Sequence, residues 1–466
     1  MSQVPEETVR HDLTAPWLDK GTTLGAPSAG IMSSTSRATP SGPHVNDPLP
    51  LASAPEDMIA QAVFYPEEKT HFIQQVLTIK VPLSSVLVEQ SFQILAERNQ
   101  ILRTSFVRTN TAGVQVVHNR SEVPVLYEDW RNLSAIEREQ RLAQVIARDA
   151  REGFPYSSPI ALRVFMATIA NDYHQLLLSF NYCAIDGWSM GLLTQEWQLI
   201  YAALSHDREM PPNSKPCYPD YLEWLMSRDL RQARLFWKSE LRTPDSTRFL
   251  ATKLSKHPRD ASGSAKASLQ LGVDLTRNIR RVARQHDCTE NVVFQCAWAM
   301  VLATLTGQKD VCFGAAFTGR SVPFKDVESM LGFTVNFLPI RMRLDEYPVF
   351  ADLLRATQTK QHKLVEFEYV SLSKIHRWCN LRKGQTLFES ILYFQNLSGL
   401  LKQQVGFFHA DVPYPLRIDI FPSVEHIGTS VHASYRLKHF EHLEIVAILD
   451  QYYTVLCNLS QSNARL

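Results

Sequence analysis

The chain has 466 residues, of which 45% are hydrophobic and 20% charged, and its formal net charge is +1 at pH 7. This balance is typical of a soluble globular protein, and the small charge gives no reason to expect nucleic acid or an anionic membrane as a partner. No apolar run reaches the roughly 18 residues that a membrane-spanning helix needs. The seven cysteines are scattered without a Cys-x-x-Cys pair, which favours reduced thiols over disulfides or a metal site.

The length exceeds one ordinary domain and suits two lobes of about 200 residues each. Residues 20–54 are rich in Gly, Ser, Thr, Ala and Pro, a composition that cannot bury enough apolar surface to order itself. We therefore predict a disordered tail at 1–54, a first lobe at 55–228 and a second lobe at 229–466. The first twenty residues lack the apolar core of a secretory signal, so we expect a cytoplasmic protein.

Strands and helices are predicted to alternate in the first lobe. Ser134-Ala135-Ile136-Glu137 has the form of a capping box, and Gly153 can close the helix that begins there. An Asn171-Asp172 turn joins two apolar runs and indicates a hairpin. The other predicted elements of this lobe are strands at 72–81, 162–169 and 173–180 and helices at 83–100 and 188–204.

The second lobe has the same alternating pattern, interrupted by a polar, lysine-containing stretch at 251–268 that we interpret as a loop. The lobe is therefore also predicted to be α/β. Its predicted helices lie at 276–286, 290–305, 350–367 and from 442 onward, and its strands at 311–317, 387–394, 415–420 and 430–437.

The stretch from Ser179 to Ser189 reads Ser-Phe-Asn-Tyr-Cys-Ala-Ile-Asp-Gly-Trp-Ser. It ends an apolar strand and turns through Asp186-Gly187 into a new helix. If the strand stayed regular, Tyr182 would share a face with His174, because alternate residues point to the same side. This stretch resembles the His-His-x-x-x-Asp-Gly motif of condensation domains from nonribosomal peptide synthetases, with Asn181 and Tyr182 at the histidine positions.

Further motifs of that family follow in the expected order after residue 55. They resemble an Arg-His-x-x-Leu-Arg-Thr-x-Phe element, a Tyr-x-Asp-Tyr-x-x-Trp element, a Gly-Arg turn, a Gly-x-x-Val-Asn element ending in Arg, and a late Phe strand ending in Gln-Asn. The matching stretches are 98–106 (with Asn99 at the histidine position), 218–224, Gly319-Arg320, 332–341 and 388–396.

The resemblance implies a V-shaped pseudo-dimer of two chloramphenicol-acetyltransferase-like lobes with a tunnel between them. Carrier proteins of the family deliver thioester and amine substrates into that tunnel on phosphopantetheine arms. We therefore expect a small-molecule or carrier-tethered substrate, a carrier protein as partner, and no bound cofactor or metal. With Met1 and no adenylation or carrier segment, the chain is interpreted as freestanding, although a fragment of a longer protein would look similar.

Acyl transfer requires positioned reactants, a path for the nucleophile's proton and stabilisation of the tetrahedral oxyanion. The resemblance implies that the second histidine of the motif either serves the last two tasks or positions the nucleophile. Tyr182 stands at this position, and a phenol of pKa about 10 is a poor base at neutral pH. Its hydroxyl can donate a hydrogen bond to an oxyanion, and Asn181 can donate or accept one. Tyr182 and Asn181 are therefore the candidate catalytic residues.

The resemblance gives Asp186 a structural role, paired with either Arg103 or Arg320. Gly187 allows close backbone approach at the turn. Cys183 is conceivable as a nucleophile, but an inert buried thiol is the favoured interpretation, and His174 is interpreted as a satisfied interior histidine. The residues expected to line the tunnel or the substrate are Cys183, Gly187, Trp188, Ser189 and Asn336.

Three functions fit these features. The favoured one is a non-canonical condensation-like enzyme of natural-product biosynthesis that forms an amide or ester, cyclises or releases its product without the histidine. The second is a catalytically silent module that recruits carrier proteins or tailoring enzymes. The third is a coenzyme A-dependent acyltransferase, which the missing histidine disfavours.

Overall fold

The structure is a computed structural model, and it describes residues 49–50, 72–108, 113–155, 157–242, 261, 263–380, 386–395, 406–408, 414–422 and 428–461. The chain divides into two compact units. The first comprises Met1–Leu51, His71–Pro219 and Leu401–Ala410, and the second comprises Ala52–Thr70, Asp220–Leu400 and Asp411–Leu466. The predicted tail and the residues up to 71 lie outside the described residues, except for Leu49–Pro50.

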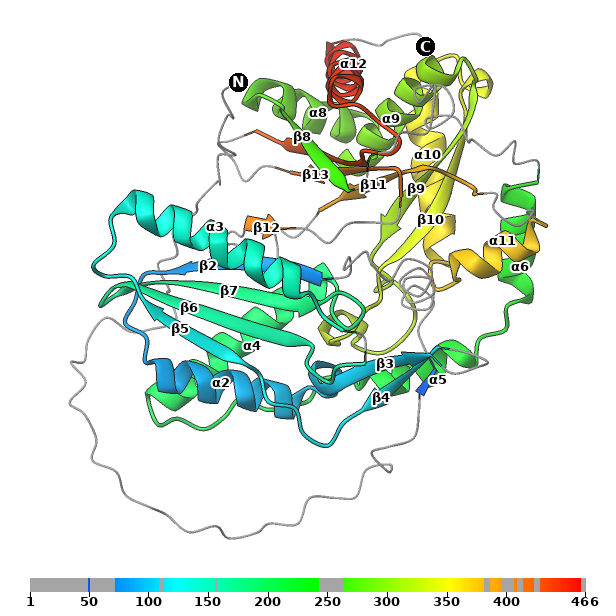
Figure 1. Ribbon diagram of the computed structural model, residues 1–466. Coiled ribbons are helices and arrows are strands. Elements are labelled where there is room, and N and C mark those ends of the chain that lie inside the picture. The colour runs from blue at the N-terminus through cyan, green and yellow to red at the C-terminus, as the bar shows by residue number, and fades with distance from the viewer. Residues whose placement is uncertain are drawn as a thin grey trace, which may run out of the picture. The chain divides into compact units, whose positions relative to one another are not determined.

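The first unit is built on a mixed five-stranded sheet of order β12-β2-β7-β6-β5. The helix α3 lies over one face of this sheet, and α2 and α4 lie over the other (Figure 1). A second, three-stranded sheet has the order β1-β4-β3. The strands are β1 (Leu49–Pro50), β2 (Phe72–Ile79), β3 (Thr104–Arg108), β4 (Gly113–Val117), β5 (Val125–Asp129), β6 (Leu162–Ala170), β7 (Tyr173–Asn181) and β12 (Gly406–Phe408), and the helices are α2 (Ser85–Arg98), η1 (Gln100–Arg103), α3 (Ala135–Glu152) and α4 (Gly187–Ser205).

The local signals in this unit explain where its elements begin and end. The predicted capping box at the start of α3 is present: the Ser134 side chain accepts from the Glu137 amide, and Glu137 accepts from the Ser134 amide. Gly153 ends the helix with a positive φ of 59°. β6 and β7 pair antiparallel as predicted, so the core strands of the sheet come from one hairpin.

The second unit contains a six-stranded sheet of order β10-β9-β11-β13-β14-β8 among its described residues. The helices α8, α9 and α12 lie together over one face of it (Figure 1). Its strands are β8 (Ser264–Gln270), β9 (Asp310–Phe317), β10 (Asn336–Arg343), β11 (Ser390–Phe394), β13 (Leu416–Phe421) and β14 (Ser430–Arg436). Its helices are α5 (Tyr218–Met226), which starts at the end of the first unit, α6 (Arg231–Glu240), α8 (Val273–Gln285), α9 (Glu290–Thr306), η2 (Val327–Ser329), η3 (Leu344–Glu346), α10 (Phe350–Val365), α11 (Leu372–Trp378) and α12 (His442–Gln461).

The helix α9 is the central buried helix of the second unit. Its N-terminus is capped by the Thr289 side chain, and Gly307 ends it in the left-handed conformation. Trp298 of α9 meets the ring of Tyr452 from α12 edge-on at 5.5 Å, and the Tyr452 hydroxyl donates to the Phe294 carbonyl at 3.0 Å. Tyr452 thereby joins two helices through both packing and a hydrogen bond.

Several elements of the second unit differ from the sequence-based predictions. The stretch 251–268 was expected to be a loop, but its last residues belong to β8, which pairs with β14. β10 and the helices α5, α6 and α11 were not predicted. Both β8 and β10 are edge strands of their sheet, and β10 includes Pro339, a residue that sheets tolerate at edges.

No single helix among the described residues has the length and apolar character to cross a membrane. By length and composition alone, α8 and α9 taken together would be long and apolar enough to span a membrane. The two helices are bent by 104° relative to each other.

Candidate active site

The turn from Asn181 to Gly187 is organised around Asn181. β7 ends at Asn181 and α4 begins at Gly187. The Asn181 carbonyl accepts from the Ala184 and Ile185 amides at 3.0 and 3.1 Å, and its side-chain Oδ1 accepts from the Cys183 amide at 2.9 Å. Asn181 therefore closes the turn with both its backbone and its side chain. Because the strand ends at Asn181, its alternation of side chains does not extend to Tyr182. The expectation that Tyr182 shares a face of the sheet with His174 therefore does not apply.

The side-chain nitrogen of Asn181 is a buried donor that makes no hydrogen bond within this turn. The Asn181 side chain is 1% exposed, and its Nδ2 has no hydrogen-bond partner among the described residues. The amide orientation follows from chemistry, because the Cys183 N–H can only donate and must face the oxygen. A buried donor without a partner costs about 1–3 kcal/mol, so the turn carries an unsatisfied donor next to Tyr182 in sequence.

Asp186 caps the helix that follows the turn. Its side chain is fully buried and accepts from the Ser189 amide at 2.8 Å as the N-cap of α4. A carboxylate at this place satisfies a helix amide and interacts favourably with the positive end of the helix dipole. The geometry therefore gives Asp186 a role in forming the turn.

The other residues of the stretch differ in burial. Tyr182, Cys183 and Ser189 are buried, whereas Gly187 and Trp188 are half-buried. Burial raises the pKa of the Cys183 thiol well above its usual range, which keeps it protonated. Because the thiolate is the nucleophilic form, burial disfavours Cys183 as a nucleophile.

His174 is satisfied in the interior of the first unit. Its Nε2 faces the Leu83 amide at 3.2 Å, and its Nδ1 lies 3.0 Å from the Thr168 hydroxyl. Burial lowers the pKa of this imidazole, so the neutral ring is favoured. Both ring nitrogens are occupied, in agreement with the interpretation from sequence.

The two candidate arginines each donate to backbone carbonyls in their own unit. Arg103 donates to the His118 carbonyl, and burial lowers the pKa of its guanidinium. Arg320 donates to three carbonyls of one loop, those of Val327, Met330 and Gly332. The pairing of Asp186 with one of these arginines stays a prediction.

The Gly319-Arg320 turn requires glycine. Gly319 has a φ of +68°, and a Cβ there would collide with the Thr334 carbonyl oxygen. Beside this turn, the buried Glu368 carboxylate accepts from the Ser321 amide at 2.8 Å, while burial raises the pKa of Glu368. The family-like Gly-Arg element is thus a tightly built structural turn.

Asn336 is held within the second unit. It is 4% exposed, and its Nδ2 donates to the Glu368 and Val370 carbonyls at 2.9 and 2.6 Å. Both amide hydrogens are therefore used in joining β10 to the segment after α10. No prediction from sequence identified this bracing role.

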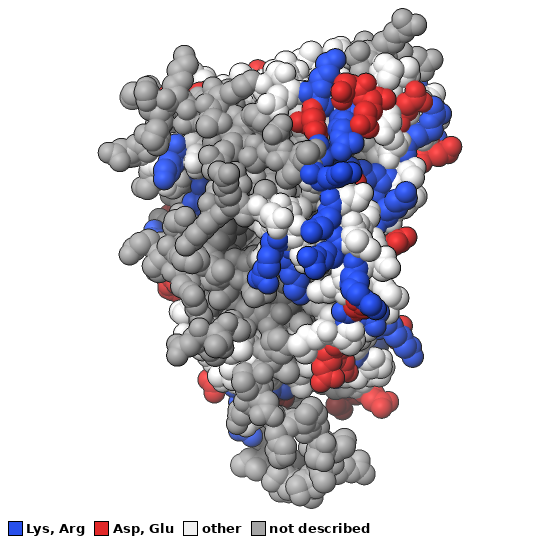
Figure 2. All heavy atoms as spheres, turned by 90° about the vertical axis from the view of Figure 1, so that its right-hand side faces the viewer, with Lys and Arg blue, Asp and Glu red and all other residues white. Residues whose placement is uncertain are grey.

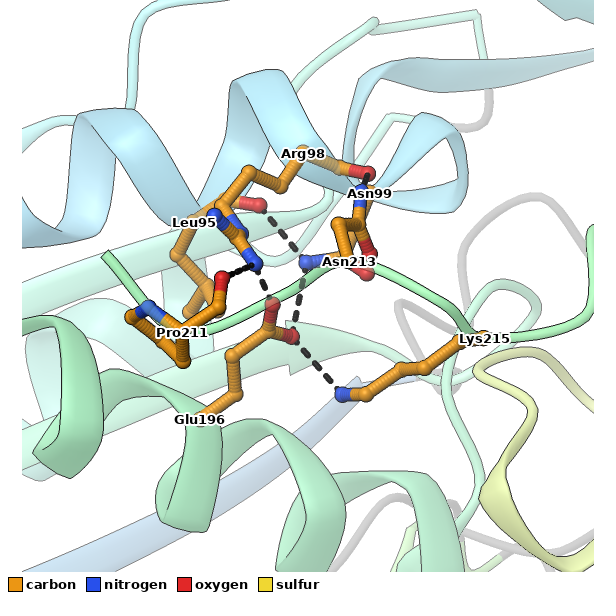
Figure 3. Close-up of polar contacts among 7 residues, drawn as sticks. All are labelled: Leu95, Arg98, Asn99, Glu196, Pro211, Asn213 and Lys215. Atoms are coloured by element: carbon orange, nitrogen blue, oxygen red, sulfur yellow. Dashed lines mark hydrogen bonds and ion pairs between the residues drawn. The ribbon is translucent and has the colours of Figure 1, made fainter. Parts of the chain in front are cut away.

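A buried charge cluster in the first unit was also missed (Figure 3). Glu196 of α4 is 5% exposed. Its carboxylate accepts from Arg98 at 3.1 Å, from the Asn99 amide at 3.0 Å and from Lys215 at 2.9 Å. These contacts join α2, α4 and the connection before α5. A glutamate inside the apolar sequence of a helix is a weak signal for such a cluster, because buried carboxylates need partners.

The residues described by the structure contain no group of three or more His, Cys, Asp and Glu side chains that could hold a metal ion. The polar groups of the turn are hydrogen-bond donors and acceptors, which can orient a carbonyl or stabilise an oxyanion.

The Condensation domain family profile matches residues 45–464 of the chain. The chain belongs to the condensation-domain family. The resemblance to condensation domains of nonribosomal peptide synthetases is thereby confirmed, with the mixed α/β fold that it implied.

Curated relatives of this condensation domain are much longer proteins. The chain is 31% identical over 398 residues to one of the proteins of the linear gramicidin synthase of Brevibacillus parabrevis, a match that covers 82% of the chain and 8% of the relative. It is 27% identical over 435 residues to another protein of the same synthase, covering 91% of the chain and 6% of the relative. The chain thus spans less than a tenth of the length of these relatives.

Solved structures share the fold at low identity. The first condensation domain of the calcium-dependent antibiotic synthetase, in complex with a substrate analogue, superposes with a TM-score of 0.75 at 15% identity, covering 91% of this chain and 98% of that one. The condensation domain of the Monacolin K polyketide synthase MokA gives a TM-score of 0.71 at 18% identity, covering 90% and 98%.

Proposed function

We propose that this condensation domain is an enzyme of natural-product biosynthesis that forms an amide or ester, or cyclises or releases an intermediate, from a carrier-tethered thioester. Family membership and the gramicidin synthase relatives support the substrate class. In the amide case, the amine attacks the thioester carbonyl, the C–N bond forms, the C–S bond breaks, and the amine proton leaves with the departing thiol.

The observation that carries the proposal is the Nδ2 of Asn181, next to Tyr182 in sequence, which has no hydrogen-bond partner among the described residues. Asn181 and Tyr182 stand where the family has two histidines. An amide and a phenol cannot serve as bases at neutral pH, but both donate hydrogen bonds that stabilise an oxyanion. A neutral amine needs little base catalysis, and good alignment of reactants contributes about 7–11 kcal/mol to lowering the barrier.

The silent recruiting module is the second candidate, and the burial of the turn favours it. Tyr182 is only 5% exposed, and Asp186 and the Asn181 oxygen are used in building the turn. A motif kept only for folding would show the same contacts.

Complementation of a gene deletion in the host separates the two functions, with the pathway product measured by mass spectrometry. For the enzyme, Tyr182→Phe and Asn181→Ala lower product by about tenfold or more, since one lost oxyanion donor costs about 10²–10³ in kcat. The matched control is Tyr201→Phe, which removes another buried hydroxyl of the first unit, one that accepts from the Ser84 amide. Full product with Tyr182→Ala would identify the silent module.

A second arm uses purified protein and an acyl thioester of either a pantetheine or coenzyme A. Product from the coenzyme A thioester alone would favour the free acyltransferase over the carrier-dependent enzyme. Melting temperatures of all variants, measured in parallel, exclude unfolding as the cause of any loss.

A further inference from the structure

The helices α6 and α11 of the second unit pack against each other and present a cluster of cations. Figure 2 shows lysine and arginine gathered in a band on the face of the molecule where α6, α10 and α11 lie in Figure 1. We call the part of this band on the two helices the α6–α11 basic face. Its residues are Arg231, Arg234 and Lys238 of α6 and Lys374 and Arg377 of α11.

The three cations of α6 lie on one side of that helix. Arg231, Arg234 and Lys238 are three, four and seven residues apart and are all exposed, so they share one side of α6. The opposite side is buried through Ala233 and Trp237. α6 is thus an amphipathic helix whose outer side is cationic.

Few acids offset this charge. The two helices contain a single acid, Glu240, and it is already bound by Lys360 of α10. Arg231 pairs with Asp229 at 2.7 Å. The side chains of Arg234, Lys238, Lys374 and Arg377 have no acidic partner among the described residues. Among the residues that the structure describes, these four cations are therefore not neutralised by an acid.

An apolar residue lies within the same surface. Leu235, next to Arg234 on the outer side of α6, is 64% exposed. An exposed leucine flanked by cations of the same helix is the arrangement of a protein interface, in which an apolar anchor supplies affinity and peripheral charges supply orientation and rate. A polyanion such as nucleic acid would use the cations alone, and the chain's net charge of +1 gives it no long-range attraction.

We propose that the α6–α11 basic face docks an acidic surface of a partner protein, with Leu235 as its apolar anchor. Glutamate and aspartate on the partner pair with Arg234, Lys238 and Arg377, and an apolar side chain between them covers Leu235. This surface includes none of the residues proposed for the chemistry, so the inference goes beyond the proposed function and does not depend on it.

Fluorescence anisotropy of the full chain with a labelled peptide tests the proposal. The probe is a helical peptide with glutamate on most positions and leucine at helical spacing, and its counterpart carries lysine in place of glutamate. The acidic peptide should bind, more weakly at high salt because the charges are screened, and the lysine peptide should not. Arg234→Glu/Lys238→Glu should weaken binding about tenfold or more, and Leu235→Ser should weaken it about tenfold.

The matched control is Arg277→Glu/Arg284→Glu, which reverses two exposed arginines of α8 in the same unit. It should leave the affinity within about twofold, since surface charges far from a contact are screened. Arg234→Gln/Lys238→Gln provides a milder change if the reversal perturbs folding, which circular dichroism would show.

No binding of the acidic peptide, or equal loss with the α8 control, overturns the proposal. Duplex DNA or anionic phosphatidylserine vesicles binding as tightly through the same residues, with Leu235→Ser unchanged, would overturn it in favour of a polyanion surface.

Discussion

Asn181 in the first unit and Asn336 in the second are both buried asparagines, 1% and 4% exposed. Their side-chain amides differ in the hydrogen bonds that they make. Asn336 donates both amide hydrogens to carbonyls. Asn181 accepts one hydrogen bond through Oδ1, and its Nδ2 has no partner among the described residues. The same residue type thus braces one unit and leaves a donor unused in the other.

The difference separates structure from chemistry at two positions that family motifs had singled out, Asn181 as a candidate catalytic residue and Asn336 as a tunnel-lining residue. A polar side chain that satisfies all its own donors and acceptors contributes to stability, and removing it leaves its partners without hydrogen bonds. A side chain with an unused buried donor is costly for the fold, and each such group calls for an explanation, of which a catalytic role is one. Stability measurements on asparagine variants therefore test the distinction directly.

The largest stability effect is expected for Asn336→Leu. The change leaves the Glu368 and Val370 carbonyls without their donor, at about 1–3 kcal/mol for each, so unfolding should become easier by roughly 2–6 kcal/mol. Urea denaturation followed by circular dichroism measures this. Asn132→Leu, at an exposed turn position, is the control and should stay within about 0.5 kcal/mol of the parent. A loss below about 1 kcal/mol for Asn336→Leu would show that the brace is unimportant.

Much of the fold could be predicted because its signals are local. The Ser134–Glu137 capping box and the Asn171-Asp172 turn each lie within a few residues of sequence, and both appear as expected. β8 could not be predicted, because its sequence, SAKASLQ, is short and polar and becomes a strand only by pairing with β14. Tertiary context decides such edge strands.

The candidate site also contains features that could be predicted from the sequence and features that could not. The Asp-Gly turn into α4 was evident in the sequence, since an Asp N-cap is a local signal. The unused Nδ2 of Asn181 depends on which atoms surround a single amide, and the Glu196 cluster brings together residues about 100 positions apart, Arg98 and Glu196. Neither leaves a pattern in the sequence.

An intermediate effect is expected for Asn99→Ala, which tests a third buried asparagine. Asn99 stands at the histidine position of a family motif, and its Nδ2 donates both to the Leu95 carbonyl at the end of α2 and to Glu196. Loss of these contacts should cost about 1–3 kcal/mol, because Arg98 and Lys215 still hold the Glu196 carboxylate. Asn99→His keeps a donor and should lose less than Asn99→Ala in the same urea titration. Equal losses for the two variants would show that the donor to Glu196 is not what matters.

The smallest stability effect is expected for Asn181→Ala, although this residue is the most buried of the three. The change removes the acceptor for the Cys183 amide, which costs about 1–3 kcal/mol, but it also removes the unpartnered Nδ2, whose burial costs a similar amount. The two contributions oppose each other, so the free energy of unfolding should change by no more than about 1 kcal/mol. The measurement is the urea midpoint of Asn181→Ala beside that of Asn336→Leu. A loss as large as that of Asn336→Leu would mean that the Asn181 amide also braces its unit, and the Asn181 donor would then no longer support the enzyme over the silent module.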